Sequence, residues 1–179
     1  TPFYRKDAGQ LCASEDETAD FYLTTARTLR QAGYLHYEIS NFALPGYESR
    51  HNLKYWRDQP YLGFGPAAHS CLDRQRFYNP PDLQQYIAAA GHCRIQEESG
   101  AVQDASERLM LGLRLAEGID LLEVEKMDAR FDEQARGCFL KKAAVFEKAG
   151  LLQINGERVS LTEEGMLVSN MLLASLLPD

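Results

Sequence analysis

The stretch from residue 37 to residue 70 (YEISNFALPGYESRHNLKYWRDQPYLGFGPAAHS) constrains this chain more than any other part of it. It combines a short strand-like run, a segment dense in aromatic and basic residues, and a turn punctuated by glycine. Connections longer than about a dozen residues without secondary structure are usually functional or disordered. The many aromatic residues argue against disorder. We therefore expect this stretch to form a defined structure that carries a function.

Two groups of residues in this stretch can carry chemistry. The first is a compact H-N-x-x-Y-W group, whose histidine could ligate a metal, bind haem iron or transfer a proton near neutral pH. Its tyrosine and tryptophan could stack on a planar ligand. The second is a glycine-rich turn, which lets a backbone approach a ligand closely. The candidate residues are His51, Asn52, Tyr55, Trp56, Gly63, Gly65 and His69, and Pro66 lies in the same turn.

Structural roles compete with each of these interpretations. A loop histidine is often hydrogen-bonded to a neighbouring backbone group, and burial is the commoner fate of such aromatic residues. A single G-x-G is frequently only a tight turn. Glu38 could contact a cofactor or be an ordinary polar residue at a strand end. The pattern alone leaves the function open.

Composition and charge exclude several classes. The chain has 179 residues and a formal net charge of −7, which argues against non-specific nucleic-acid binding because that depends on Lys and Arg neutralising phosphates. No run approaches the roughly 18 apolar residues of a membrane span, and no secretory leader opens the chain. We therefore expect a cytoplasmic protein.

The cysteines point away from a metal centre. Cys12, Cys71, Cys93 and Cys138 are widely separated, and no C-x-x-C or C-x-x-x-C spacing is present. The sequence therefore offers neither a zinc ribbon nor a cluster-binding loop. Isolated cysteines in such a chain are most often small buried residues, and we expect that here.

The first half of the chain is expected to be α/β. Residues 1–13 read as a connector, and Ser14 with Glu17 forms a capping box for a helix to about Ala32, followed by Gly33 as its C-terminal cap. A strand over 34–42 would follow, so a parallel sheet is expected. The remaining elements predicted here are a loop at 43–60, a short strand over 61–64, a break at 77–81 and a helix from Asn79 to about Ala90.

The second half is predicted to be a separate domain. A polar, glycine-containing segment over 96–103 suggests a boundary, which gives domains 1–95 and 96–179. A cap at Asp104 and Glu107 predicts a helix that ends at Gly118, and two further helices are predicted over 121–127 and 133–149. Asn155-Gly156 predicts a hairpin with a type I′ turn, and Thr162 is the predicted cap of a last helix to about 176. This order is winged-helix-like. Residues 104–179 hold 14 Asp or Glu and 9 Lys or Arg, a net charge of −5, so a protein is a better partner for this domain than DNA.

The motifs taken together resemble a known family. The run AGYLHYEISNFALPGYESRHNLKYWRDQPYLGFGPAAHS is similar to a region of the oxygen-independent coproporphyrinogen III oxidase family of radical S-adenosylmethionine (SAM) proteins. RHNLKYW resembles the HemW-type branch, regarded as haem chaperones, because coproporphyrinogen dehydrogenases carry an R-N-F-x-G-Y-T-T type of sequence there. ERLMLGLRLAEGID and the C-terminal run from 148 to 173 resemble the family's C-terminal domain.

The resemblance implies a fold and cofactors. The expected fold is the C-terminal strands and helices of a partial (β/α)6 barrel followed by the winged-helix-like domain. In that family a C-x-x-x-C-x-x-C loop holds a [4Fe-4S] cluster beside SAM, and this loop is absent here. We therefore expect the chain to be the C-terminal part of a longer protein and to be inactive by itself in radical chemistry.

The resemblance also assigns roles to residues. The turn from Gly63 to Ser70 matches the family's G-x-G-x-x-A-x-S-like turn near the adenosyl cofactor, which adds Ala68 to the candidates and places His69 against SAM. His51 is the implied haem-iron ligand. Many relatives have Cys just before the Arg of this motif, and Ser49 stands there instead.

Three hypotheses follow for function. The first is a HemW-type haem chaperone with haem or porphyrin as its ligand and a haem-accepting protein as its partner. The second is a coproporphyrinogen III dehydrogenase, which decarboxylates propionate side chains oxidatively. The third is a non-catalytic protein-interaction module. Because barrel strands without their neighbours leave unpaired edges, we also expect the chain to self-associate or to rearrange its first 95 residues.

Overall fold

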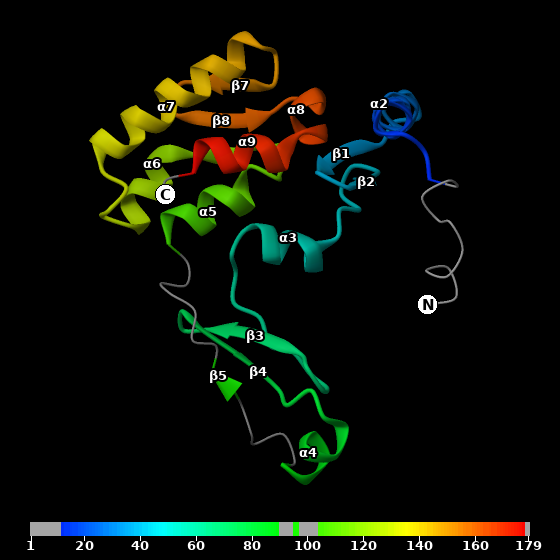
Figure 1. Cartoon of the computed structure of the whole chain (residues 1–179), viewed down its shortest axis with the longest axis vertical. Helices are drawn as coiled ribbons and strands as arrows, with labels where there is room; N and C mark the ends of the chain where they lie inside the picture. The colour runs from blue at the N-terminus through cyan, green and yellow to red at the C-terminus, as the bar shows by residue number, and fades with distance from the viewer. Residues whose placement is uncertain (1–11, 90–94, 97–103, 178–179) are drawn as a thin grey trace.

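The computed structural model describes residues 12–89, 95–96 and 104–177. In these residues short helices and strands alternate, with the longest helices at 15–31 and 133–148 (Figure 1). In chain order the elements are α2 (Glu15–Gln31), β1 (Leu35–Glu38), β2 (Asn41–Ala43), α3 (Arg50–Trp56), β3 (His69–Leu72), β4 (Gln75–Tyr78), α4 (Leu83–Ala88), β5 (Ile95–Gln96), α5 (Ala105–Gly112), β6 (Ile119–Asp120), α6 (Leu121–Met127), α7 (Glu133–Lys148), β7 (Leu152–Asn155), β8 (Arg158–Leu161), α8 (Glu163–Leu167) and α9 (Ser169–Leu176).

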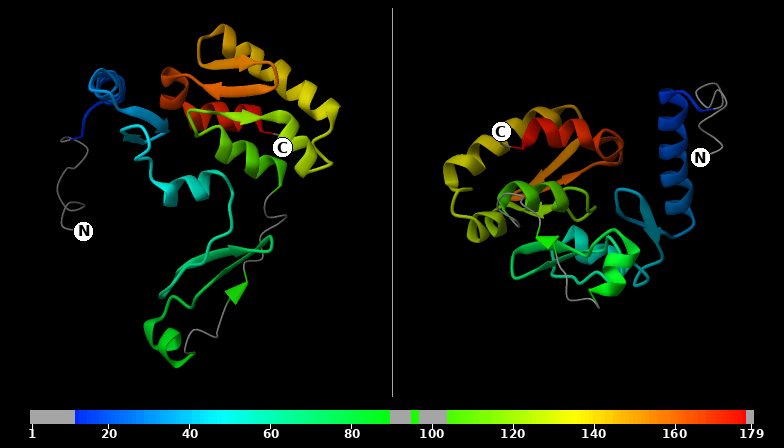
Figure 2. Two further views of the ribbon diagram at one scale, coloured as in Figure 1. Left: turned by 180° about the vertical axis from the view of Figure 1, so that it is seen from behind. Right: turned by 60° about the horizontal axis from the view of Figure 1, so that its bottom comes forward.

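The strands of the described residues form three small sheets, ordered β1-β2, β3-β4-β5 and β6-β8-β7. Every pairing recorded in them is antiparallel, so the parallel sheet expected in the first half is not found within these residues. Two views place β3, β4 and α4 at the opposite end of the molecule from the sheet that contains β7 and β8 (Figures 1 and 2).

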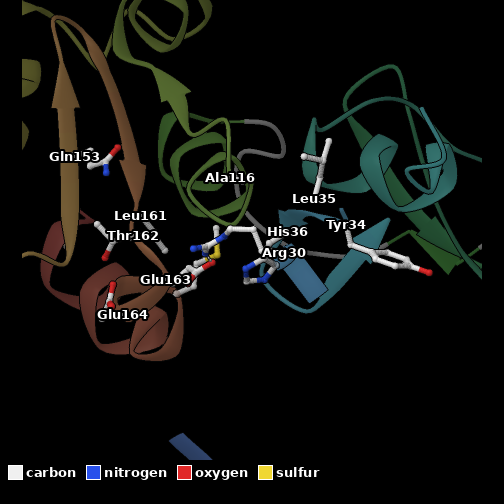
Figure 3. Close-up of a pocket in the computed structure, with 11 residues that line it drawn as sticks. Arg30, Tyr34, Leu35, His36, Ala116, Gln153, Leu161, Thr162, Glu163 and Glu164 are labelled. Carbon is white, nitrogen blue, oxygen red and sulfur yellow. Dashed lines mark ion pairs between the residues drawn. The ribbon is translucent and has the colours of Figure 1, made fainter. Parts of the chain in front are cut away.

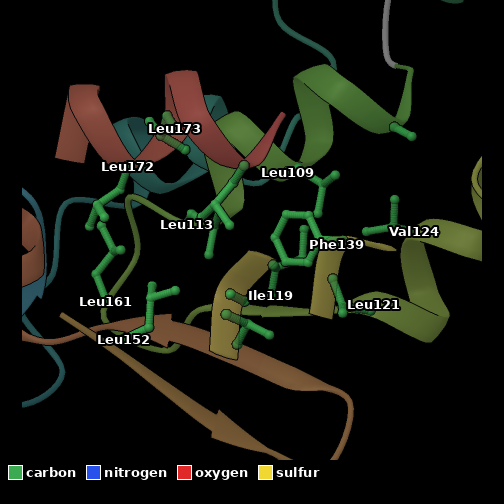
Figure 4. Close-up of a cluster of buried hydrophobic side chains, with 14 of the residues drawn as sticks. Leu109, Leu113, Ile119, Leu121, Val124, Phe139, Leu152, Leu161, Leu172 and Leu173 are labelled. Atoms are coloured by element: carbon green, nitrogen blue, oxygen red, sulfur yellow. The ribbon is translucent and has the colours of Figure 1, made fainter. Parts of the chain in front are cut away.

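The hydrophobic core lies in the second half of the chain. Helices α5, α6, α7 and α9 pack against the β6-β8-β7 sheet and bury leucine, isoleucine and valine side chains between them (Figure 4). The most deeply buried members, all with at most 2% of their surface exposed, include Leu109, Leu113, Ile119, Leu121, Val124, Leu152, Val159 and Leu172. Burial of such side chains is the main stabilising contribution to this part of the protein.

Aspartate residues begin the helices of this half. Asp104, Asp120 and Asp132 each accept a hydrogen bond from a backbone N–H in the first turn of the helix that follows. Asp128 accepts from the amide of Ala105 and from the Arg130 side chain. These bonds, the arginine's first, hold the pKa of Asp128 well below its usual range. The helices predicted over 104–118, 121–127 and 133–149 are confirmed, although α5 ends at Gly112 and not at Gly118, and the caps Asp120 and Asp132 were not predicted.

Two glycine assignments in this half are corrected by the structure. Gly118 does not end a helix: it has φ +65°, and a Cβ there would lie 2.1 Å from the Val159 carbonyl oxygen of β8. The β7–β8 hairpin is present, but Asn155 pairs with Arg158, so Gly156 and Glu157 form the turn. Of these two only Gly156 has a positive φ, as in a type II′ turn and not the expected type I′.

The start of the chain confirms one prediction and alters the next. Ser14 and Glu17 form the capping box of α2, and Gly33 follows that helix with φ +88°. The single strand expected over 34–42 is a hairpin instead, because β1 ends at Glu38 and β2 begins at Asn41. The register shifts between His36 and Glu38 within β1, and the chain turns back at Ile39 and Ser40.

The segment between 61 and 82 also differs from expectation. The predicted break at 77–81 contains the end of β4, and Tyr61 forms only an isolated bridge to Cys71. Asp82, not Asn79, caps the following helix. Asn79 is instead buried, with its side-chain amide directed at the carbonyls of the glycine-rich turn. Cys71 is buried as expected, whereas the burial predicted for Cys12 and Cys138 is wrong.

The two halves are joined through a short backbone pairing. The amide of Ile39 donates to the Arg114 carbonyl at 2.9 Å, and the amide of Ala116 donates to the Tyr37 carbonyl at 3.1 Å. Glu38 thereby forms an antiparallel bridge with Leu115. Helix α2 also contacts α8. The β1–β2 hairpin is in this way attached directly to the segment that follows α5.

His36 lies in an aromatic layer inside the hairpin. Its ring stacks on Phe42 with 4.1 Å between centroids and meets the edge of Tyr22 from α2 at 5.8 Å. Burial lowers the pKa of His36, against the opposing effects of the Ile39 carbonyl and Glu38. A histidine in such a layer is favoured in its neutral form, so proton uptake should loosen the hairpin.

Exposed apolar residues are concentrated in the first half. Within the described residues, large apolar side chains that remain exposed there include Phe21, Tyr47, Leu62, Phe64, Leu83 and Ile87, with Phe64 at 86% and Tyr47 at 81%. Exposed apolar surface of this kind usually marks an interaction site or a tendency to aggregate. The first half therefore leaves much of its apolar surface without a covering.

We expect Leu172→Ala to destabilise the chain by about 2–5 kcal/mol, because it empties space in the fully packed core. Val145→Ala, on a residue that is 65% exposed, should change the free energy of unfolding by about 0.5 kcal/mol or less. Urea unfolding followed by circular dichroism compares the two. Equal effects would contradict the placement of the core.

The stability of the chain should fall as the pH drops below about 6.5. The folded pKa of His36 is depressed, so the unfolded chain binds more protons in that range and folding is disfavoured there. Urea midpoints at pH 7.5 and pH 5.5 measure the effect. In His36→Gln the difference between the two midpoints should shrink, and an unchanged difference would exclude His36 as its source.

We expect the chain to self-associate as its concentration rises, because so much apolar surface is exposed in its first half. Light scattering at increasing concentration gives the mass directly. The double variant Phe64→Ser with Ile87→Ser should reduce association. The control Val145→Ala changes an exposed side chain in the second half and should reduce association less. A monomer at all concentrations, with residues 12–89 protected from hydrogen exchange, would contradict this prediction.

Candidate functional site

The H-N-x-x-Y-W group lies on a short helix, not in the loop that the sequence predicted. Helix α3 spans Arg50–Trp56, and the Ser49 side chain caps it by accepting from the Asn52 amide at 3.3 Å. Ser49 therefore has a structural role in this protein as the N-cap of α3. The aromatic-rich composition concealed the helix, although a serine N-cap preceded it.

His51 and Tyr55 lie one helical turn apart on the same side of α3. His51 is exposed, and its ring meets the ring of Tyr55 edge to face, with 4.9 Å between centroids and an angle of 89°. Tyr55 in turn meets the ring of Tyr61 at 4.7 Å. This side of α3 presents a histidine supported by aromatic rings and open to a ligand.

Trp56 is half-buried and has a different neighbour. The guanidinium carbon of Arg114 lies 5.6 Å from the centroid of the Trp56 ring, within the range of a cation–π interaction. Arg57 at the end of the helix pairs with Glu117 at 3.2 Å. The structure thus separates the motif into an open side with His51 and Tyr55 and an attached side with Trp56.

The glycine-rich turn is held by side chains from three places. The Gly63 amide donates to the Ser70 hydroxyl at 3.0 Å, and the Gly65 amide donates to the Tyr86 hydroxyl at 3.1 Å. The side-chain amide of Asn79 donates to the Gly65 carbonyl at 2.9 Å. The sequence predicts Asn79 as a helix cap. In the structure its side chain is buried and its hydrogen bonds to the turn carbonyls fix the turn.

Both glycines are required by the geometry of this turn. A Cβ on Gly63 would lie 2.2 Å from the His69 carbonyl oxygen, and Gly65 has φ +102°. The backbone amides of both glycines already donate hydrogen bonds within the protein. These glycines therefore allow close packing of the turn and leave no free N–H donor for a ligand. Of the other two candidates, Ala68 is half-buried, and the exposed His69 stacks on Tyr78 across the β3–β4 pair at 5.2 Å.

The helix and the turn are connected through Tyr61. Its ring contacts Tyr55 of α3, and its backbone exchanges hydrogen bonds with Cys71 at 2.9 and 3.0 Å. Cys71 and His69 are separated by one residue on β3. The structure therefore brings the two candidate groups into one region by way of an aromatic contact and a backbone bridge.

Three pockets lie near these elements. One of about 160 Å³ adjoins the glycine-rich turn and is lined by Gly63, Ser70, Asn79 and Tyr86, among others. A second, of about 630 Å³, lies between the hairpin, α3 and residues 115–117, and it is lined by Leu53 of α3 and by Arg57 just after that helix. A third, of about 540 Å³, lies between α2 and α8, where Arg30 pairs with Glu163 (Figure 3).

Glu38 is a buried polar residue whose role the sequence left open. Only 1% of its surface is exposed, and neither of its carboxylate oxygens has a hydrogen-bond partner among the described residues. Burial first, and the Glu38 charge second, raise the pKa of Tyr22 to about 12. Burying a carboxyl group without a hydrogen-bond partner costs free energy, so Glu38 lowers the stability of the hairpin.

Two properties of the described residues bear on cofactors and membranes. Among residues 12–89, 95–96 and 104–177, no three His, Cys, Asp or Glu side chains converge in a way that would hold a metal ion. No helix in that part of the chain is long and apolar enough to cross a membrane.

Known proteins resemble both the second half and the whole chain. Residues 102–168 match the HemN C-terminal domain family. Over 93% of its length the chain is 33% identical to "Heme chaperone HemW" of Lactococcus lactis, and over 94% it is 32% identical to the protein of the same name in Mycobacterium tuberculosis. It is 29% identical to "Radical S-adenosyl methionine domain-containing protein 1, mitochondrial" of Danio rerio over 98% of its length.

A solved structure shares the fold. The Escherichia coli coproporphyrinogen III oxidase HemN, described as a radical SAM enzyme, superposes with a TM-score of 0.67 over 96% of this chain at 20% identity. The chain spans only 42–44% of the length of these relatives and 43% of the HemN structure. The chain is therefore similar to the C-terminal part of HemW-type proteins and of the HemN structure, and residues 102–168 match the HemN C-terminal domain family.

Proposed function

We propose that the longer protein represented by this chain handles haem as a HemW-type chaperone, and that the open side of α3 binds the haem. The observation that carries this proposal is the exposed His51 ring on a capped helix, braced by Tyr55 at 4.9 Å. Relatives named as haem chaperones match nearly the whole chain, which supports the same function.

The chemistry of this side suits haem iron. A neutral imidazole nitrogen is a common axial ligand of haem, and His51 is exposed enough to offer one. Tyr55 limits the rotation of that imidazole and adds aromatic surface on which a porphyrin edge could rest. Asn52 lies in the same first turn, and the hydrogen bond that its backbone amide donates to the Ser49 hydroxyl helps to fix that turn.

The proposal includes cofactors for the longer protein. A [4Fe-4S] cluster and SAM would supply radical chemistry there. Within this chain, Ala68 and His69 next to Gly63 and Gly65 would face the adenosyl cofactor. The pocket at this turn, about 160 Å³, is below the 300–1,000 Å³ typical of whole ligand sites, so it would hold only part of such a molecule.

Other parts of the proposal concern architecture and context. Residues 1–95 would complete a partial (β/α)6 barrel with the strands that precede them in the longer protein. Residues 96–179 would be a winged-helix-like domain. A haem-accepting protein would be the partner, and the cytoplasm the location. The exposed apolar side chains of the first half support this division, because neighbouring strands would cover them.

Haem titration followed by absorbance tests the proposed role of His51. The chain should bind haem saturably with a Soret shift, and His51→Ala should lose the shift and bind at least about tenfold more weakly, since the iron loses its ligand. Lys54→Ala, on the same helix, is the matched control and should bind as wild type.

Two results would contradict the proposal. Saturable binding that is identical in wild type and His51→Ala would remove α3 from the site. Turnover of coproporphyrinogen by the full-length protein, reconstituted with its cofactors, would favour the dehydrogenase alternative over the chaperone.

A further inference from the structure

Arg114, the residue two positions after α5 ends, contacts three separate elements. Its carbonyl accepts from Ile39 of the hairpin at 2.9 Å. Its guanidinium lies over the Trp56 ring of α3, and its Nη2 donates to the Asn170 side chain of α9 at 3.3 Å. A single residue of the second half therefore connects the hairpin, α3 and the last helix.

Residues next to Arg114 contact the N-terminal end of α3 through Tyr37. Ala116 donates to the Tyr37 carbonyl, and the Tyr37 hydroxyl accepts from the Ser49 amide at 3.4 Å, at the N-cap of α3. Both ends of α3 are thus attached, directly or through Tyr37, to residues 114–117. We call these residues the 114–117 segment.

Helix α3 needs this attachment. It has seven residues, and helices this short are not stable by themselves in water. Its direction must therefore be set by tertiary contacts. The contacts with Arg114 and Glu117 involve Trp56 and Arg57, whereas His51 and Tyr55 meet each other on the open side.

We propose that Arg114 is a positioning residue for the His51 site and acts through Trp56. The inference rests on the proposed haem binding at His51 and deepens it. Arg114 does not touch the haem. It fixes the orientation of α3, so the histidine presents its nitrogen at a constant angle. The HemN C-terminal domain, to which Arg114 belongs, thereby takes part in haem binding.

The contacts differ in what they can contribute. Arg114 and Trp56 are both half-buried, and a cation–π pair strengthens as it loses water. The Arg57–Glu117 pair is exposed on both sides, and such pairs contribute little. Arg114 is thus the main anchor at the C-terminal end of α3, and its charge over the ring is the property that matters.

Three variants test the proposal by haem titration of the full chain. Arg114→Met keeps the apolar stem but removes the charge, and Trp56→Leu removes the ring. Each should weaken haem binding about three- to tenfold and broaden or shift the Soret band, as expected for the loss of one cation–π pair. The double variant should be little weaker than either single one, because both remove the same contact.

Two further variants distinguish an effect on the position of α3 from an effect on overall stability. Arg114→Lys restores the charge and should recover most of the affinity and the wild-type Soret band. Arg130→Met removes an arginine that forms ion pairs with Asp104 and Asp128 at the other end of α5, and it should leave haem binding and spectrum unchanged. Urea midpoints identify any variant that fails to fold, in which case Arg114→Gln replaces Arg114→Met.

The outcomes distinguish this inference from the proposed function. If His51→Ala abolishes binding while Arg114→Met and Trp56→Leu bind as wild type, the positioning role is wrong and the haem site stands. If Arg130→Met weakens binding as much as Arg114→Met, the effect is one of stability and the inference is wrong. If His51→Ala binds haem normally, both are wrong.

Discussion

The backbone pairing between Tyr37–Ile39 and Arg114–Ala116 is the interaction on which the arrangement of this protein depends. It consists of two recorded hydrogen bonds, at 2.9 and 3.1 Å, around the Glu38–Leu115 bridge. A two-stranded hairpin is marginal by itself in water. The pairing adds residues of the second half to β1, and that half has the large core. Residues of the second half, distant in sequence, therefore stabilise the hairpin.

The two halves are unequal in what they can bury. The second half packs leucine, isoleucine and phenylalanine side chains from four helices on a three-stranded sheet, whereas the first half leaves Phe64 and Tyr47 almost fully exposed. Glu38 adds a buried carboxylate without a partner in the described residues. A region with uncovered apolar residues and an unpartnered buried charge is incomplete in its packing. This agrees with a chain that spans less than half the length of its relatives.

Much of the second half could be predicted from local signals because its helices begin at side-chain caps. Asp104 was predicted as a cap and the hairpin was predicted from Asn155-Gly156, whereas Asp120 and Asp132 show their capping role only in the structure. The errors came from residues with two competing roles. Asn79 suits a helix cap but bonds a distant turn, and Gly118 suits a helix end but packs against β8. Such choices are made by tertiary contacts, which local patterns do not contain.

The same limit applies to the candidate site. Sequence alone marked His51, Tyr55 and Trp56 as one group, and helix α3 was missed because its aromatic residues are weak helix formers. Their separation onto two sides follows from the helix geometry and from Arg114, which lies 58 positions after Trp56 in the chain.

An exposed histidine on a seven-residue helix can hold a fixed direction only if the remaining side chains anchor that helix. Trp56 suits this task because its large ring can pack against a guanidinium and still leave the opposite side free. In the proposed site the motif contains both the haem ligand and its anchor, so it would need two partners: haem on one side and the segment that carries Arg114 on the other. In that proposal the residues that match the HemN C-terminal domain complete the support of the helix through Arg114.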